Sequence, residues 1–375
     1  MAAERRDEAK VEEPSLPPGW STRLSRSTGK TVYVHRKFGI EQWLPPPFVV
    51  TQVAAHYDTL GHQELVASKS VQSRGETARG MKRRRARRDC AGVAAFNNWV
   101  TSCQCSRVAQ AVAAAGGGAK KHIHVVDLAG GKGSGMQKWH HDGLTLGRYT
   151  LIDVSVASLG AAKARLTRLP HPPVTPAFVC MDVTRQSRAW RPPKESADVA
   201  VLQFAANYLA KQPEGLATAL RLAAYSVRPG GYLIVTWTNG EKVAARARPE
   251  LLRRSHSTES TSLHVRCGTA DVFCSKKAAE AMQSGCGTPM YTFHLAGAVE
   301  GCTEHYLAYH QLEALAAAGG WKPCEFLSDI TAAPPAWDSI TVQKRPALAA
   351  ADVQTCSLYA TALFIRAAGG EGKLN

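Results

Sequence analysis

Residues 125–136 read VVDLAGGKGSGM: an apolar run that ends at Asp127, then a turn with four glycines, then Met136 at the start of a helix-capable stretch. Glycine allows the backbone to approach a ligand closely and to take positive φ angles without steric cost. A second apolar run, residues 149–152, ends at Asp153. The order of strand, glycine-rich turn, helix, strand and acid is typical of a nucleoside pocket whose acid binds ribose hydroxyls. The turn lacks the G-x-G-x-x-G spacing of NAD-binding proteins, and the simpler interpretation is a glycine-rich surface turn.

Apolar runs and helical periods alternate along the rest of the chain. Strands are predicted at residues 123–128, 149–153, 178–181, 199–204 and 232–237, and helices at 94–115, 156–169, 213–227 and 305–319. This alternation predicts an α/β fold with a mostly parallel sheet covered by helices on both faces. We expect an irregular, polar insertion at about residues 240–290 and a late strand at 357–365 that pairs at the sheet edge.

The composition is that of a basic globular protein. The 375 residues are 45% hydrophobic and carry a net charge of +16, which favours a polyanionic partner such as nucleic acid over a merely soluble basic protein. No apolar run approaches the length of a membrane span, so we expect no membrane contact. The ten cysteines are scattered, and the pair Cys103 and Cys105 is too closely spaced for a zinc knuckle. We therefore expect reduced thiols and no metal.

Charge and proline content divide the chain into four parts. Residues 1–15 are polar and predicted to be disordered, and residues 16–47 form a small module bounded by prolines. Residues 48–92 are a basic linker and N-terminal extension, and residues 93–370 form the large α/β domain. The linker contains KRRRARR at 82–88. This run is interpreted as a nuclear localisation signal, as a contact for the phosphates of a transcript, or as a solvated basic segment.

The module at 16–47 contains LPPGW at 16–20, Trp43 and PPP at 45–47. This pattern resembles a WW domain, a small three-stranded antiparallel sheet that docks polyproline ligands. The resemblance places Trp20, Tyr33 and Pro46 in a small core and Trp43 on the opposite face, where it grips proline. Val32 stands where the second aromatic residue of the groove is usual.

The first loop of the module matches the WW subclass that binds phospho-Ser-Pro. Two guanidinium groups and a hydroxyl on one short loop suit a phosphate dianion, although an ordinary solvated loop remains open. The candidate ligand-binding residues of the module are Arg23, Ser25, Arg26, Tyr33 and Trp43.

The glycine-rich turn resembles motif I of S-adenosylmethionine-dependent methyltransferases, and its surroundings make the resemblance more specific. An ordered set of motifs is similar to that of the eukaryotic mRNA cap guanine-N7 methyltransferases over about residues 53–366. The set comprises VAAHY at 53–57, FNNW at 96–99, the turn at 127–139, DVS at 153–155, MD at 181–182, QF at 203–204, NY at 207–208, RPGGY at 228–232, Glu304 and SLY at 357–359.

This resemblance implies a class I (Rossmann-like) methyltransferase fold, S-adenosyl-L-methionine as donor, the GpppN end of capped RNA as substrate, and a nuclear location. It implies that the donor is bound by Asp127, Gly131, Asp153, Asp182, Gln203 and Tyr208. It implies that the cap is bound by Asn97, Lys132, Asn207, Glu304 and Tyr359. Guanine N7 carries a free lone pair and the sulfonium is an activated donor, so we expect positioning alone and no catalytic acid, base or nucleophile.

Several positions depart from the usual pattern of this family. Thr101 replaces a lysine that contacts the carboxylate of the donor, and Asn207 replaces a histidine. In motif I, Ala129, Gly130, Ser134 and Gly135 replace a glycine, a cysteine, a glycine and an acid. Two alternatives therefore stay open: an RNA methyltransferase of other specificity, and a non-catalytic scaffold that binds the cap or the polymerase tail.

Overall fold

The computed structural model describes residues 16–47, 91–116, 122–139, 144–185, 192–253, 262–284, 288–295, 299–341 and 343–368. The expectations for residues 1–15, for most of the linker and for the basic run at 82–88 lie outside these residues.

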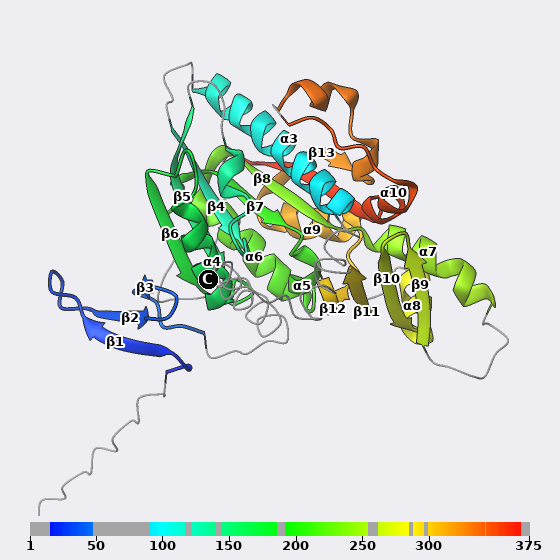
Figure 1. Ribbon diagram of the computed structural model, residues 1–375, viewed down its shortest axis with the longest axis horizontal. Helices are drawn as coiled ribbons and strands as arrows, with labels where there is room; N and C mark the ends of the chain where they lie inside the picture. The colour runs from blue at the N-terminus through cyan, green and yellow to red at the C-terminus, as the bar shows by residue number, and fades with distance from the viewer. Residues whose placement is uncertain are drawn as a thin grey trace, which may run out of the picture.

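A seven-stranded sheet forms the centre of the molecule (Figure 1). Its strands, in spatial order, are β13 (Trp321–Leu327), β14 (Tyr359–Arg366), β8 (Val227–Thr238), β7 (Ala197–Gln203), β4 (His122–Leu128), β5 (Thr145–Asp153) and β6 (Thr175–Cys180). The five strands from β8 to β6 are parallel, whereas β14 runs antiparallel to both β8 and β13. This order confirms the expected class I methyltransferase fold.

Helices cover both faces of the sheet. On one face, α3 (Ala91–Ala115) and α4 (Val156–Leu166) share a buried cluster with Val125, Val199 and Ile234. On the other, α6 (Pro213–Ser226) and α9 (Tyr309–Ala318) share a second cluster with Val126, Ala200 and Val235. Consecutive residues of one strand thus enter different cores, which explains why the parallel strands are continuous apolar runs in the sequence.

The chain order sets the position of a ligand crevice. The chain forms β4 first, adds β5 and β6 on one side, and then returns to add β7 and β8 on the other. The order therefore reverses between β4 and β7, and ligands of open α/β sheets bind outside the carboxyl ends of the strands at such a point. Asp127, Asp153 and Gln203 lie at the carboxyl ends of their strands, and Asp182 follows β6.

Two expectations about the second half are corrected. The segment at 240–290 is regular: it contains α7 (Gly240–Arg253), β9 (Ser262–Cys267), β10 (Ala270–Ser275) and α8 (Lys276–Ser284). With β11 (Met290–Leu295) and β12 (Val299–His305) its strands form a four-stranded antiparallel sheet, which has its own buried cluster. The late strand β14 is internal, because β13 takes the edge; Pro323, which cannot donate to a ladder, is tolerated there beside a bulge.

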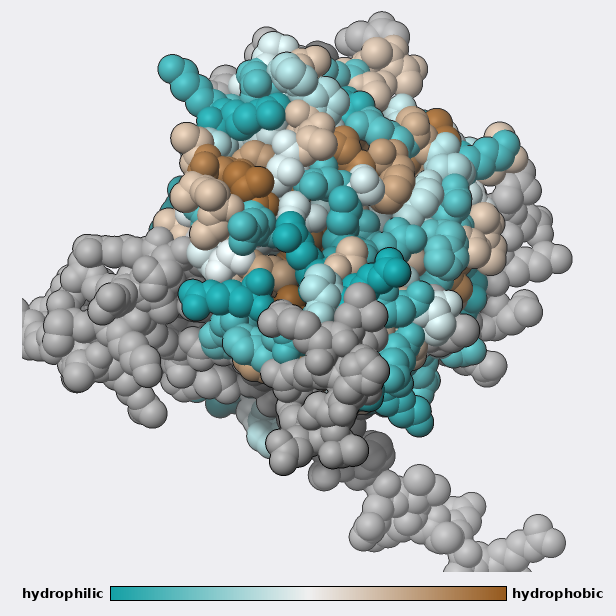
Figure 2. All heavy atoms as spheres, turned by 90° about the vertical axis from the view of Figure 1, so that its right-hand side faces the viewer, coloured by the Kyte–Doolittle hydropathy of each residue, from teal (hydrophilic) through white to brown (hydrophobic). Residues whose placement is uncertain are grey.

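Short elements complete the structure: η1 (Met136–Lys138), α5 (Ala206–Leu209), η2 (Ile330–Ala332), η3 (Pro335–Ser339) and α10 (Ala350–Cys356). In the face shown in Figure 2, hydrophilic residues predominate and hydrophobic residues form small separate patches. Across the described part of the chain, no helix combines the length and apolar character that crossing a bilayer requires.

The N-terminal module is the expected three-stranded antiparallel sheet, with β1 (Trp20–Leu24), β2 (Thr31–His35) and β3 (Ile40–Gln42) in that order. Its register pairs Trp20 with His35 and Tyr33 with Gln42. The sheet lies beside β6 at the edge of the large sheet (Figure 1), and β3 contacts β6.

Candidate active site

The glycine-rich turn after β4 is shaped by its contact with two carboxylates. A Cβ atom at Gly130 would lie 2.4 Å from the carboxyl carbon of Asp127, so only glycine fits there. Gly131 has a φ of +54° and donates its N–H to Asp153 Oδ2 at 2.8 Å. The turn is therefore held against the end of β5, as a nucleoside pocket requires.

Asp153 is buried at the end of β5 and organises the neighbouring backbone. Besides Gly131, the N–H of Ser155 donates to Asp153 Oδ1 at 2.8 Å. Ser155 in turn caps α4, accepting a bond from the N–H of Ser158. Both oxygens of this carboxylate therefore act as hydrogen-bond acceptors, which is the role that binding of ribose hydroxyls requires.

Asp127 lies deeper, at the end of β4. The hydroxyl of Tyr149 donates to its Oδ2, and burial raises the pKa of Asp127 to about 7, with a further contribution from Asp153. A Cβ at Gly135 would lie 2.9 Å from the Tyr149 hydroxyl. Glycine at position 135 therefore leaves space for the hydroxyl of Tyr149, which forms a hydrogen bond with Asp127.

A buried lysine lies beside this acid. Lys138, from η1, is 7% exposed and donates from Nζ to Asn98 Oδ1 of α3 at 3.0 Å. Burial lowers its pKa to about 8, while Cys105 and Asp127 act to raise it. Asn98, Thr101 and Cys105 follow a helical spacing on α3, so the ammonium lies along the helix face that carries Thr101. Thr101 itself is buried, and its hydroxyl donates to the carbonyl of Asn97 at 2.8 Å.

The remaining donor candidates lie at the ends of β6 and β7. Asp182 accepts bonds from the N–H of Thr184 at 2.9 Å and from its hydroxyl at 2.6 Å, which fixes the turn after β6. Gln203 Nε2 is buried and has no hydrogen-bond partner in the described structure. An amide donor left unpaired at the carboxyl end of β7 fits a polar ligand in the crevice.

Two of the residues expected to bind the cap belong to α3 and to the glycine-rich turn. Asn97 Oδ1, on α3, is also buried without a partner in the described structure, which leaves it an acceptor for a ligand. Lys132 lies within the turn and is half-buried.

Glu304 belongs to a buried network of hydroxyl groups. It is 4% exposed, and the hydroxyl of Tyr291 on β11 donates to its Oε2 at 2.9 Å. Burial raises the pKa of Glu304 to about 7, whereas hydrogen bonds from Thr238, Tyr291 and Tyr208 lower it. Tyr208, expected near the donor, therefore contacts the carboxylate expected in the cap pocket.

Asn207 supports this network rather than offering a free polar group. Its Nδ2 donates to the carbonyls of Thr238 at 2.9 Å and His305 at 3.0 Å, and its Oδ1 accepts from the N–H of Thr238 at 2.9 Å. The amide joins the end of β8 to the end of β12. Its geometry is that of a structural link between the two strands, and its contact with the cap stays a prediction.

Tyr359 forms an aromatic wall beside the network. Its ring meets Phe204 edge-on, with centroids 5.4 Å apart, and Phe293 at 6.3 Å. Phe204 has a φ of +57°, which is unusual for a bulky residue and typical of strained functional sites. The two aromatic rings connect the end of β7 with the start of β14.

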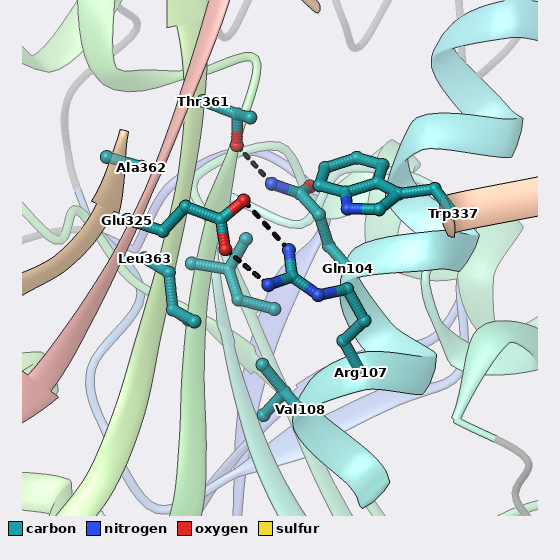
Figure 3. Close-up of a pocket in the computed structure, with 9 residues that line it drawn as sticks. Gln104, Arg107, Val108, Glu325, Trp337, Thr361, Ala362 and Leu363 are labelled. Atoms are coloured by element: carbon teal, nitrogen blue, oxygen red, sulfur yellow. Dashed lines mark hydrogen bonds and ion pairs between the residues drawn. The ribbon is translucent and has the colours of Figure 1, made fainter. Parts of the chain in front are cut away.

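The pocket in Figure 3 is a separate feature, between α3 and the β13–β14 pair. Arg107 forms two hydrogen bonds with Glu325, one of them 2.9 Å long, and Gln104 donates to Thr361. These side chains form hydrogen bonds with one another across the pocket, and none of them belongs to the predicted site. Among the described residues, no group of His, Cys, Asp and Glu side chains could hold a metal.

The N-terminal sheet presents two different faces. Burial alternates along β3, where Ile40 and Gln42 are buried and Glu41 is exposed, followed by Trp43 at 48% exposure. Arg23 lies on the exposed face and pairs with Glu41 at 2.7 Å. The Tyr33–Gln42 pair puts Tyr33 on the other face, in agreement with its expected place in the small core and not with a ligand contact.

Some of the candidate ligand-binding groups in and beside the first loop of the module already have partners within the module. Ser25 is buried, and its hydroxyl accepts a bond from the N–H of Thr28 at 3.4 Å. Arg26 is exposed and forms no ion pair with the residues that the structure describes. A phosphate group would therefore meet Arg26 directly and compete with Glu41 for Arg23.

Sequence reasoning missed three polar side chains that lie against the candidate site residues: Lys138, Tyr149 and Tyr291. Lys138 follows motif I in the sequence, but its burial beside α3 depends on tertiary packing. The two tyrosines lie within apolar strands and read as core residues, because only the structure shows that their hydroxyls reach Asp127 and Glu304.

Residues 53–322 match the family described as the mRNA (guanine-N(7))-methyltransferase domain. Several solved structures are similar to this chain at low sequence identity. The CcbJ methyltransferase of Streptomyces caelestis has 15% identity and a TM-score of 0.41, covering 70% of this chain and 90% of its own. An S-adenosylmethionine-dependent methyltransferase of Clostridium acetobutylicum has 12% identity and a TM-score of 0.41, covering 73% and 92%. One from Mesorhizobium loti has 14% identity and a TM-score of 0.39, covering 65% and 91%.

Proposed function

The chain belongs to the mRNA (guanine-N7)-methyltransferase family and is an S-adenosylmethionine-dependent enzyme, and we propose that it methylates N7 of the terminal guanine of GpppN-capped RNA through the residues described above. Capped RNA is the substrate that this domain implies. The high positive charge of the chain suits that substrate, because phosphate groups attract Lys and Arg side chains.

The chemistry requires positioning and little else. S-adenosylmethionine supplies an activated methyl group on sulfur, and guanine N7 carries a lone pair with no proton to remove. The protein side chains then have to hold the two reactants in line and exclude competing orientations. The proposal therefore assigns no residue the role of nucleophile or proton relay.

The residues around the crevice fit the donor. In this proposal Asp153 accepts hydrogen bonds from the ribose hydroxyls, and Asp182 accepts one from the amino group of adenine. Gly131 lets the backbone approach the ligand, and Gln203 Nε2 lacks a hydrogen-bond partner among the described groups. Asp127 completes the pocket by holding Gly130 and Tyr149 in place.

Lys138 replaces the cationic charge that Thr101 lacks. The donor ends in an amino-acid carboxylate, and the family usually meets it with a lysine at position 101. Here the buried ammonium of Lys138 lies along the same face of α3, held by Asn98. With a pKa of about 8, it is mostly charged at neutral pH and loses this charge in mild alkali.

The observation that carries the substrate assignment is the buried carboxylate of Glu304 within its hydroxyl network. An ionised carboxylate can accept the N1–H and N2–H of guanine together, and adenine presents no such pair of donors. Tyr359 adds an aromatic surface for the base, and Asn97 and Lys132 lie beside the turn where the cap phosphates would enter.

One experiment tests this function directly. Labelled S-adenosylmethionine is incubated with GpppRNA, and the product is digested to locate the methyl group. Label in N7-methylguanosine supports the proposal. Label on an internal base would favour another RNA methyltransferase, and the absence of label together with retained cap binding would favour a non-catalytic scaffold.

We also propose that residues 16–47 act as a WW domain for phospho-Ser-Pro peptides such as the tail of RNA polymerase II. The exposed Trp43 is available for proline, and Arg23 and Arg26 are exposed on β1 and on the loop that follows it. Such recruitment would take place in the nucleus, which agrees with the interpretation of residues 82–88 as an import signal. Fluorescent peptides with and without phosphate, and imaging of a tagged chain that lacks residues 82–88, test these two points.

A further inference from the structure

The buried face of the N-terminal sheet is continuous with the catalytic core. Ile40 is 1% exposed and belongs to the cluster that contains Leu159 and Ala162 of α4. Leu44 belongs to the cluster that contains Val179 and Met181. The module therefore contributes apolar residues to the clusters on both faces of the large sheet, although most of the linker between the module and the catalytic domain lies outside the described residues.

One polar contact crosses this interface at the end of β6. The side-chain amide of Gln42 forms two hydrogen bonds with the backbone of Cys180: Nε2 donates to the carbonyl at 3.1 Å, and Oε1 accepts the N–H at 2.8 Å. Both residues are buried. The amide of Gln42 thus imitates the next strand of the sheet at this point.

The position of Cys180 gives this contact its importance. Cys180 is the last residue of β6, and the N–H of Met181 donates to the carbonyl of Asp153 at 3.0 Å. Asp182, whose carboxylate shapes the following turn, comes next. The short segment before Asp182 is therefore held on one side by the module and on the other by the residue that is expected to bind ribose.

We propose that Gln42 is a positioning residue for the donor site: its double hydrogen bond to Cys180 fixes the segment that carries Asp182. The inference rests on the proposed function, because it takes Asp182 as the contact for adenine. A buried N–H and a buried carbonyl each lose the hydrogen bond from Gln42 when that residue is replaced, so the end of β6 is held less firmly. The N-terminal sheet is on this account part of the donor site as well as a peptide-binding module.

The test compares Gln42→Met with Lys163→Ala in the full chain. Methionine keeps the length of glutamine and removes both hydrogen bonds to Cys180, together with the bond of 2.8 Å from Gln42 Nε2 to the carbonyl of Leu44 within the module. Lys163 on α4 also contacts the module, through the carbonyl of Gly39, but it is exposed and far along the helix from Ser155. It therefore controls for a general loosening of the interface.

Calorimetric titration measures the affinities for S-adenosylhomocysteine and for the cap analogue GpppG. We expect Gln42→Met to weaken binding of S-adenosylhomocysteine by about threefold to tenfold, with GpppG affinity unchanged, and Lys163→Ala to change neither. A second variant, Gln42→Glu, keeps an acceptor for Cys180 N–H but loses the donor to its carbonyl, and it should weaken the same affinity.

The outcomes separate this inference from the function on which it rests. If the parent binds S-adenosylhomocysteine and the Gln42→Met variant binds it equally well, the inference is overturned and the proposed function stands. If the affinities for S-adenosylhomocysteine and GpppG fall together, Gln42 has only a structural role and the inference is also overturned. A parent that binds no S-adenosylhomocysteine overturns both.

Discussion

The hydroxyl of Tyr291 lies 2.9 Å from the carboxylate of Glu304, and the two residues face each other in the register of β11 and β12. Both side chains are buried, so the pair forms a polar centre inside the smaller sheet. A carboxylate in such a place is costly to ionise, and burial raises its pKa to about 7. A site that keeps a carboxylate in spite of this cost has a use for its charge.

Glu304→Gln should abolish most cap methylation without affecting the donor. Glutamine preserves the size of the side chain but turns one acceptor into a donor that faces the N2–H of guanine. A site built to hydrogen-bond a base edge loses strongly when one partner is mismatched, so activity on GpppRNA should fall at least about tenfold. The affinity for S-adenosylhomocysteine, measured by calorimetry, serves as the control. A fully active variant would remove Glu304 from the guanine pocket.

The same substitution should change the pH dependence of stability. Glu304 has a pKa of about 7 in the folded protein against 4.5 as its ordinary value, so the folded state holds the proton more tightly. Ionisation of Glu304 therefore lowers the free energy of unfolding as the pH rises from about 4.5 to about 7, and above that range no further decrease follows. Glu304→Gln should gain on the order of 2 kcal/mol over the parent at pH 8 and little at pH 4.5. Urea denaturation at both pH values measures this, and a gain independent of pH would contradict it.

Asp153→Ala should weaken the donor site by about 3 kcal/mol or more, because the ribose loses two charge-assisted bonds. The variant also releases the N–H groups of Gly131 and Ser155, which loosens the glycine-rich turn. Asp198→Ala is a matched control: Asp198 is equally buried on the same sheet, but it bonds Arg228 at 2.7 Å near the start of β7. Calorimetry with S-adenosylhomocysteine should show a large loss only for Asp153→Ala, and equal losses would deny Asp153 a direct contact.

Lys138→Met should weaken binding of S-adenosylhomocysteine and leave adenosine, which has no carboxylate, almost unaffected. Loss of a charge-assisted bond is worth about 1.5–3 kcal/mol, or at least tenfold in affinity. Because the pKa of Lys138 is about 8, the affinity of the parent for S-adenosylhomocysteine should also fall as the pH rises from 7 to 9. The variant should show no such decline. An equal loss for both ligands would assign Lys138 to folding instead.

Glu41→Gln should strengthen binding of a phospho-Ser-Pro peptide to the full chain, because it releases Arg23 from its ion pair at 2.7 Å. Arg26→Ala should reduce the preference for the phosphorylated peptide, and Trp43→Ala should abolish binding of both forms. Fluorescence anisotropy at low and high salt measures these effects, since exposed charged contacts weaken as salt increases. Equal binding of both peptides by the parent would leave a plain proline-binding module.

The sequence predicted the parallel strands and the acids at their ends because both follow local rules. Val125 and Val126 are apolar on both faces, and Asp127 and Asp153 end their strands where a crevice is expected. It did not predict β13, whose proline and charged residues are tolerated only at an edge, or the regular sheet at 262–305, whose strands alternate polar and apolar residues. Tyr291, Lys138 and Gln42 act through partners far along the chain, and no local pattern shows such contacts. The structural role of Asn207 was likewise invisible in the sequence, because its amide links the ends of two strands that lie far apart along the chain.

The two edge strands of the large sheet are protected from pairing with another chain in different ways, and this affects self-association. An open edge strand offers unpaired backbone groups to a neighbouring chain and so promotes aggregation. At one end, Pro323 and the adjacent bulge interrupt β13; at the other, Gln42 occupies the backbone groups of Cys180 on β6. A catalytic fragment that begins after the N-terminal sheet would present that second edge to solvent. Such a fragment should self-associate at concentrations where the longer chain stays monodisperse, a difference that light scattering would detect.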